Sequence, residues 1–116
     1  MASTGQLADL DGETADVLRA MSHPVRLEIL RMTSRQELPA GRLGEHLGLG
    51  QAQTSQHLRV LRDSGLVTVR RDGNRRLYRV NFELARRVRQ TLDAIWAPAV
   101  DALKHAAEER HRREQP

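Results

Sequence analysis

The chain has 116 residues, the size of one domain, and its 39% hydrophobic and 29% charged residues are typical of a globular protein. It contains no cysteine, which excludes disulfides and thiolate metal sites, and no apolar run approaches the roughly 20 residues that a membrane-spanning helix needs. Its net charge of +4 is uneven, because residues 51–80 carry seven arginines against two aspartates.

The first third of the chain predicts two helices. Residues 1–12 are expected to form a flexible arm or the start of the first helix, which ends near Ala20 and which Gly12 is expected to interrupt. Ser22 is expected to cap the second helix, with Pro24 in its first turn. The apolar residues from Val25 to Met32 predict that this second helix is almost fully buried.

The next segment predicts a helix-turn-helix. Glu37-Leu38 is expected to form a short strand, and a short helix follows over residues 41–47. The turn Gly48-Leu49-Gly50 then leads into a longer helix over residues 51–63, which Gly65 ends as a left-handed cap.

A basic β-hairpin follows the helix-turn-helix. Residues 66–71 and 75–80 are strand-like and flank Asp72-Gly73, a dipeptide typical of tight hairpin turns. A hairpin in this position is a wing. The expected fold is mostly α with a small β-hairpin wing, a winged helix-turn-helix with the order helix, helix, short strand, helix, helix, strand, strand, helix.

The last segment predicts one long helix. Asn81 is expected to cap it, and Pro98 is expected to bend it because proline removes a backbone hydrogen bond. The expected organisation is a winged helix-turn-helix core over residues 13–80, a C-terminal helix over residues 81–110 and a frayed tail over residues 111–116.

The charged and polar side chains of the helix-turn-helix and the wing point to duplex DNA. Gln53 and Gln56 lie on the polar face of their helix at i, i+3, and a glutamine amide can donate to adenine and accept from it at once. A basic wing beside such a helix favours contact with the phosphate backbone or the minor groove. The residues predicted to contact DNA are Gln51, Gln53, Thr54, Ser55, Gln56, Arg59, Arg70, Arg71, Asn74, Arg75 and Arg76.

Three motifs occur in a characteristic order. They are MSHPVRLEIL at residues 21–30, SQHLRVLRDSGLV at residues 55–67 and RDGNRRLY at residues 71–78. Together they resemble the motifs of ArsR/SmtB-type bacterial repressors, over about residues 14–97. The resemblance implies a dimeric winged helix-turn-helix repressor, with its first and last helices at the dimer interface. A dimer would place two DNA-reading helices about one DNA turn apart, which predicts an inverted-repeat operator. Residues 1–13 lack the basic start and apolar stretch of a signal peptide, so we expect a cytoplasmic protein.

Apolar residues on the first and last helices agree with a dimer. The last helix carries more apolar surface than a peripheral helix needs, which favours a two-fold interface over packing on the chain's own core alone. The residues predicted to form this interface are Leu7, Leu10, Val17, Val88, Leu92, Ile95, Trp96 and Val100.

The metal sites of the family are altered or missing in this chain. The family's cysteine box is replaced by residues 37–43, with Pro39 and Gly41 at the thiolate positions, which excludes arsenic, cadmium or lead sensing there. A second family site lies on the last helix, where this chain offers nitrogen and oxygen ligands suited to nickel or zinc. These candidate ligands, whose spacing differs from that of the family, are Asp101, His105, His111 and Glu114.

Three functions therefore remain at the level of sequence. The first is a DNA-binding regulator, acting as a repressor or an activator. The second adds nickel or zinc as the signal. The third is a winged helix that binds a second regulatory protein rather than DNA. No nucleophile–base pair, glycine-rich phosphate loop or His-Glu-x-x-His motif occurs, so we do not expect an enzyme.

Overall fold

The computed structural model describes the backbone of residues 4–115 and the side chains of residues 12–115. The chain divides into two compact units, residues 1–85 and 86–116. Its elements follow the order α1 (Thr4–Met21), α2 (Pro24–Arg35), β1 (Leu38–Pro39), α3 (Ala40–Leu47), α4 (Gln51–Asp63), β2 (Val67–Asp72), β3 (Arg75–Val80) and α5 (Phe82–Glu114). This is the predicted winged helix-turn-helix. None of the helices within the described range is long and apolar enough to cross a membrane.

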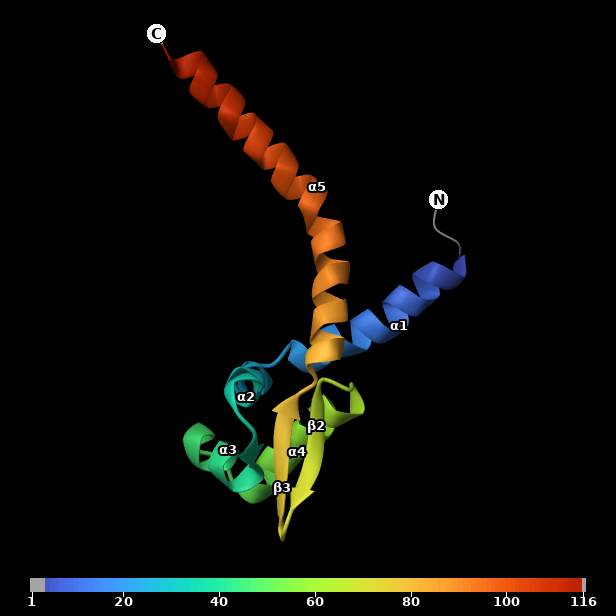
Figure 1. The fold of residues 1–116 in the computed structure, drawn as a ribbon, viewed down its shortest axis with the longest axis vertical. Coiled ribbons are helices and arrows are strands. Elements are labelled where there is room, and N and C mark those ends of the chain that lie inside the picture. Colours follow the sequence, from blue (N-terminus) through green and yellow to red (C-terminus); the bar gives the residue numbers. More distant parts are fainter. Residues whose placement is uncertain (1–3, 116) are drawn as a thin grey trace. The chain divides into compact units, whose positions relative to one another are not determined.

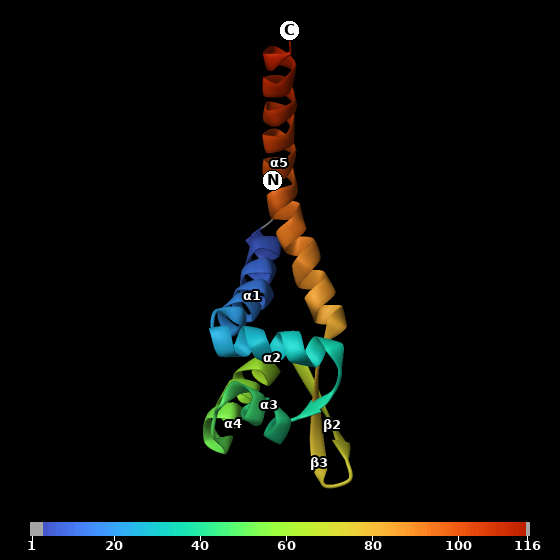
Figure 2. The same ribbon diagram turned by 90° about the vertical axis from the view of Figure 1, so that its left-hand side faces the viewer.

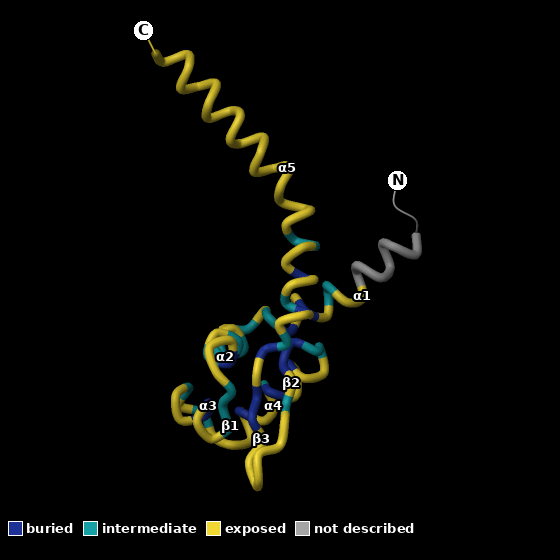
Figure 3. Tube along the Cα trace, viewed as in Figure 1, coloured by how far each residue is buried: buried dark blue, intermediate teal, exposed yellow. Residues whose placement is uncertain are grey.

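The core of the first unit lies where α1, α2, α4 and the sheet meet. Figure 3 shows the buried segments gathered there and the tip of the hairpin exposed. The core is almost wholly aliphatic, as the small number of aromatic residues requires. Its most deeply buried apolar side chains are those of Val17, Ile29, Leu43, Leu58 and Leu61.

The helix α1 differs from the sequence prediction in its continuity. It runs from Thr4 to Met21 without a break at Gly12. A glycine in a helix costs only about 1 kcal/mol relative to alanine, and a cost of that size does not by itself break a helix. The side chains of Leu7 and Leu10 lie outside the described residues.

The prediction that Ser22 caps α2 was wrong. His23 has the extended backbone of an N-cap, and its Nδ1 atom accepts from the backbone N–H of Val25 at 3.1 Å. Pro24 has no N–H, so Val25 offers the first free donor of the helix. The hydroxyl of Ser22 instead donates to the carbonyl of Arg19 at 2.7 Å, at the end of α1.

The prediction that α2 is almost fully buried was also wrong. Only Ile29 and Thr33 are buried, and Leu27 is 46% exposed. A helix on the surface of a small domain buries one stripe, and the apolar residues off that stripe remain in contact with solvent.

The short strand β1 completes a three-stranded antiparallel sheet of order β1-β3-β2. The wing is the β2–β3 hairpin, whose tip projects beyond α3 and α4 in both ribbon views (Figures 1 and 2). Asp72 pairs with Arg75, so the turn consists of Gly73 and Asn74. Gly73 has φ of 63°, which an L side chain rarely adopts and which two-residue hairpin turns require at this position.

The long helix α5 begins at a side-chain cap. Asn81 accepts from the N–H of Leu84 through Oδ1 at 3.3 Å, as predicted, and its Nδ2 donates to the carbonyl of Gly65 at 3.0 Å. The helix continues to Glu114, beyond its predicted end, and contains Pro98 in its interior. Figure 1 shows the helix changing direction in its middle part, as expected for an internal proline.

Candidate nucleic-acid interface

The helix α4 has one buried and one exposed face. Thr54, Leu58 and Leu61 are buried. Gln53, Gln56 and Arg59 lie opposite this stripe, whereas Gln51 and Ser55 are exposed in the first turns of the helix. All but one of the residues of this helix that were predicted to contact DNA are therefore exposed. Those exposed residues are Gln51, Gln53, Ser55, Gln56 and Arg59. We call this set the reading face.

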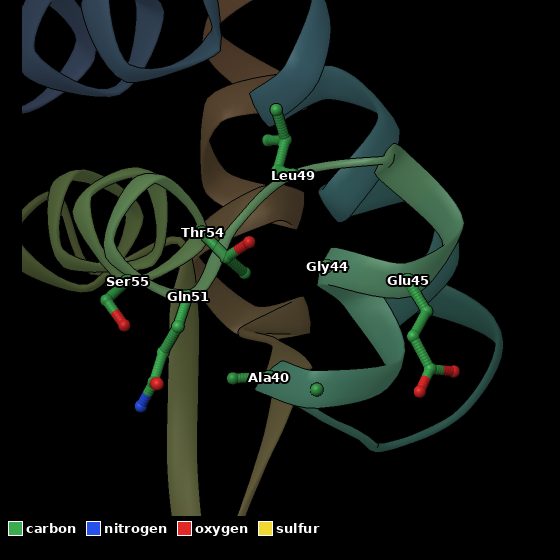
Figure 4. A pocket seen from close by; sticks show the side chains of 8 residues that line it. Ala40, Gly44, Glu45, Leu49, Gln51, Thr54 and Ser55 are labelled. Carbon is green, nitrogen blue, oxygen red and sulfur yellow. The ribbon is translucent and has the colours of Figure 1, made fainter.

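Thr54 cannot contact DNA as predicted, because its side chain is turned into the fold. It is only 1% exposed, and its hydroxyl donates to the carbonyl of Gly50 at 2.9 Å. Figure 4 shows Thr54 pointing toward α3, whereas Gln51 and Ser55 point away from it. Thr54 is four residues before the buried Leu58 and therefore shares its stripe of the helix.

The turn between α3 and α4 is tightly packed on its inner side. Gly48 ends α3 with φ of 68°, and the N–H of Leu49 returns to the carbonyl of Gly44 at 3.0 Å. A Cβ atom at Gly44 would lie 3.0 Å from the hydroxyl oxygen of Thr54 and 3.2 Å from the carbonyl oxygen of Leu49. Gly44 thus permits the close approach of α3 to α4. The sequence analysis missed this role, for which no local signal exists.

A concavity of about 350 Å³ lies between α3 and α4 beside the same turn. Its lining includes Ala40 and Gly41 from the start of α3, and Gln51 and Ser55 from the start of α4 (Figure 4). The first turns of both helices therefore border one hollow, and two residues of the reading face lie on its rim.

The wing carries its arginines on exposed positions. Arg70, Arg71, Asn74, Arg75 and Arg76 are all exposed, as predicted for backbone contacts. Arg71 lies directly opposite Arg76 in the β2–β3 register. Like charges in directly opposed positions destabilise a strand pair. Within residues 12–115 neither side chain has an ion-pair or hydrogen-bond partner, so no described side chain supplies this pair with a counter-charge.

Two other arginines of the wing do have acidic neighbours. Arg70 donates through Nε to Glu37 Oε2 at 2.6 Å, and Arg75 lies 3.8 Å from Asp72. The hydrogen bond to Glu37 and the negative charge of its carboxylate raise the pKa of the Arg70 guanidinium. Within residues 12–115, the arginines of the wing without an acidic partner are therefore Arg71, Arg76 and Arg79.

Histidines link the helices of the core. The rings of His23 and His57 are 4.6 Å apart and tilted by 51°. Burial, followed by the nearby His23 and Arg26, lowers the pKa of His57. His46 on α3 contacts Glu28 on α2 at 3.2 Å, and hydrogen bonding to Arg31 is the main reason that the pKa of Glu28 falls to about 2.

The four predicted metal ligands all lie on exposed positions of α5. Asp101 and His105 share one face at i, i+4, whereas His111 is 3.1 Å from the side chain of Gln115. Within the described part of the chain, no three histidine, aspartate or glutamate residues come together in a way that could hold a metal ion.

Comparison with known proteins agrees with this geometry. Residues 21–70 match the model of a helix-turn-helix domain. The arsenical resistance operon repressor of Staphylococcus xylosus is 41% identical over 83 residues, which cover 72% of this chain and 80% of that protein. The HTH-type transcriptional regulator YgaV of Escherichia coli is 39% identical over 99 residues, which cover 84% of this chain and 100% of YgaV.

A solved structure gives the same picture. The homodimeric winged helix-turn-helix DNA-binding domain from Mycobacterium bovis, described as a possible ArsR-family regulator, aligns with a TM-score of 0.66. It is 26% identical, and the alignment covers 82% of this chain and 89% of that one. The family predicted from the three motifs is confirmed, and the chain belongs to the ArsR family of winged helix-turn-helix DNA-binding transcriptional regulators.

Proposed function

We propose that the protein represses transcription by binding an inverted-repeat operator as a homodimer. In each protomer the reading face of α4 enters the major groove, and the wing holds the phosphate backbone. Two such helices related by a two-fold axis read half-sites about one DNA turn apart. Since the proposed partner is operator DNA, the proposed place of action is the cytoplasm.

The opposed arginines of the wing are the observation that carries this proposal. Arg71 and Arg76 face each other across the hairpin without a counter-charge among residues 12–115. A phosphate group would supply that charge, since two guanidinium groups can share the oxygens of one anion. Arg75 and Asn74 at the tip of the wing are proposed to contact the same strand.

The base contacts are proposed for the reading face. Gln53 and Gln56 are exposed, lie at i, i+3 and have side chains long enough to reach base edges. Gln51, Ser55 and Arg59 flank them and are proposed to contact bases or phosphates. Thr54 is left out because it is buried.

Replacing Gln56 or Gln53 with alanine should weaken operator binding by about 1–3 kcal/mol and leave binding to random duplex unchanged, because a base contact carries sequence information. Gln90→Ala, an exposed glutamine on α5, is the matched control and should change neither affinity. Footprinting of the DNA upstream of the protein's own gene identifies the operator, and a binding titration at fixed salt measures the effect. Equal losses on operator and random duplex would refute base reading by these residues.

The dimer is proposed from the exposed apolar side chains of α5. Ile95, Trp96, Val100 and Leu103 are each more than half exposed and recur at helical spacing. Exposed apolar clusters of this kind mark interaction sites, and the related domain from Mycobacterium bovis is homodimeric. Val17 and Val88 belong to the buried residues of the chain itself and are not included, although they were predicted at the interface. Leu92 is half-buried.

A divalent metal is the second candidate for the signal. It is favoured by the exposed placement of Asp101 and His105 on one helical face, since a two-fold partner could complete the ligand set. Nickel or zinc at micromolar concentration should then change operator affinity at least tenfold, and His105→Ala should abolish the change. If a titration of the purified dimer shows no metal binding below about 1 mM, the metal is removed as a candidate signal.

A further inference from the structure

Glu37 and Arg70 form an ion pair that spans the small sheet. Glu37 immediately precedes β1, and Arg70 lies on β2. The sheet order is β1-β3-β2, so the pair reaches across β3. The bond from Arg70 Nε to Glu37 Oε2 is 2.6 Å long, between residues that are 33 positions apart in sequence.

The pair separates Arg70 from the other arginines of the wing. The side chain of Glu37 is only 26% exposed, whereas that of Arg70 is 58% exposed, so the pair draws Arg70 back onto the sheet. Arg71 and Arg76 have no such partner within residues 12–115. Arg75 has an acidic neighbour in Asp72, but the two charged groups are 3.8 Å apart and both side chains are exposed, so this ion pair is weak.

Charge decides what this arrangement does near DNA. An arginine adds to phosphate binding by neutralising one phosphate and releasing its condensed counterion. A guanidinium whose charge is already matched by a carboxylate at hydrogen-bonding distance has little left for a phosphate, and the carboxylate itself repels the DNA backbone. A DNA phosphate must therefore displace Glu37 before it can use Arg70.

We propose that Glu37 is a positioning residue that holds Arg70 back from DNA and so keeps the sequence-independent affinity of the wing low. The inference rests on the proposed function, because it assumes that the wing faces phosphates. Low non-specific affinity matters for a regulator, since a genome offers an excess of competing sites.

The test is a double-mutant cycle on a duplex of random sequence, so no operator is needed. Wild type, Glu37→Gln, Arg70→Gln and the double variant are titrated over a range of salt concentrations, after thermal unfolding has shown that each is folded. Glu37→Gln should steepen the slope of log K against log salt by about 0.9 for each protomer, or roughly two for a dimer. Between about 50 and 200 mM salt this is an extra three- to fourfold loss of affinity for each protomer.

The double variant separates two explanations. If Glu37 acts through Arg70, its removal steepens the slope much less when Arg70 is already glutamine than when Arg70 is present. If Glu37 acts only by its own negative charge, Glu37→Gln tightens binding equally in both backgrounds, and the inference is overturned. Glu45→Gln is the charge control, because it removes an exposed carboxylate on α3 without releasing an arginine, and it should leave the slope unchanged.

Two further outcomes have defined meanings. If Glu37→Gln does not fold, Glu37→Asp keeps the charge but shortens the reach to Arg70, and it should steepen the slope in the same way. An unchanged or shallower slope in these variants overturns the inference. If wild type binds random duplex without salt dependence, the proposed DNA-binding role of the wing fails instead.

Discussion

Replacing Trp96 with glutamate should leave the protein monomeric at micromolar concentration and lower its operator affinity more than a hundredfold. Trp96 is 62% exposed in the single chain, and Ile95, Val100 and Leu103 extend the same apolar surface. A helix with this much exposed apolar surface gains its stability by packing against a partner. A tryptophan at the centre of an interface commonly contributes 2 kcal/mol or more to binding, which is about thirtyfold in affinity. In a two-fold dimer both protomers carry the substitution, so the loss occurs twice.

The measurement is sedimentation or light scattering together with an operator titration. Gln90→Glu adds the same charge to an exposed polar position of α5 and should remain dimeric. A Trp96→Glu variant that stays dimeric would assign the apolar surface of α5 to another partner. A monomer that still binds the operator with wild-type affinity would contradict the two half-site mode of binding.

Replacing Gly44 with alanine should destabilise the protein by about 1–3 kcal/mol, although alanine favours helices over glycine by about 1 kcal/mol. The new Cβ atom would lie 3.0 Å from Thr54 Oγ1 and 3.2 Å from the carbonyl oxygen of Leu49. Thr54 is fixed by its bond to Gly50, and Leu49 contributes backbone, so neither gives way cheaply. The start of α4 must then move away from α3, which tilts the reading face.

Gly41→Ala is the matched control for this change. It lies on the same helix, but nothing occupies the 4 Å around its Cβ position, so the alanine should stabilise the fold. Urea unfolding measures both variants, and an operator titration of folded Gly44→Ala should show weaker binding. Equal stability of the two variants would mean that α3 and α4 are less tightly packed than the structure shows.

Local patterns in the sequence predicted most of the fold. The bounds of α4, its end at Gly65, the hairpin around Gly73 and the cap at Asn81 all depend on neighbouring residues, and the structure confirms them. The exposed face of α4 followed in the same way from the 3.6-residue period. Thr54 was assigned to DNA from its position in the leading turn, although its spacing to Leu58 indicates burial.

The remaining features depend on contacts between distant segments. Nothing near Glu37 indicates that it reaches Arg70 across β3, and nothing near Gly44 indicates that Thr54 fills the space beside it. Capping was mispredicted for a different reason. Serine is the commoner N-cap, but His23 has the extended backbone beside Pro24 and the ring nitrogen in reach of Val25.

Arg26 has a consequence for how α4 is held in the fold. Its Nε donates to the carbonyl of Ala20 at 2.6 Å at the end of α1, and one of its terminal nitrogens lies 3.5 Å from Nδ1 of His57 on α4. One guanidinium thus connects the end of α1 to the helix that carries the reading face. The position of α4 relative to the end of α1 therefore depends on a cation on α2 as well as on the apolar core.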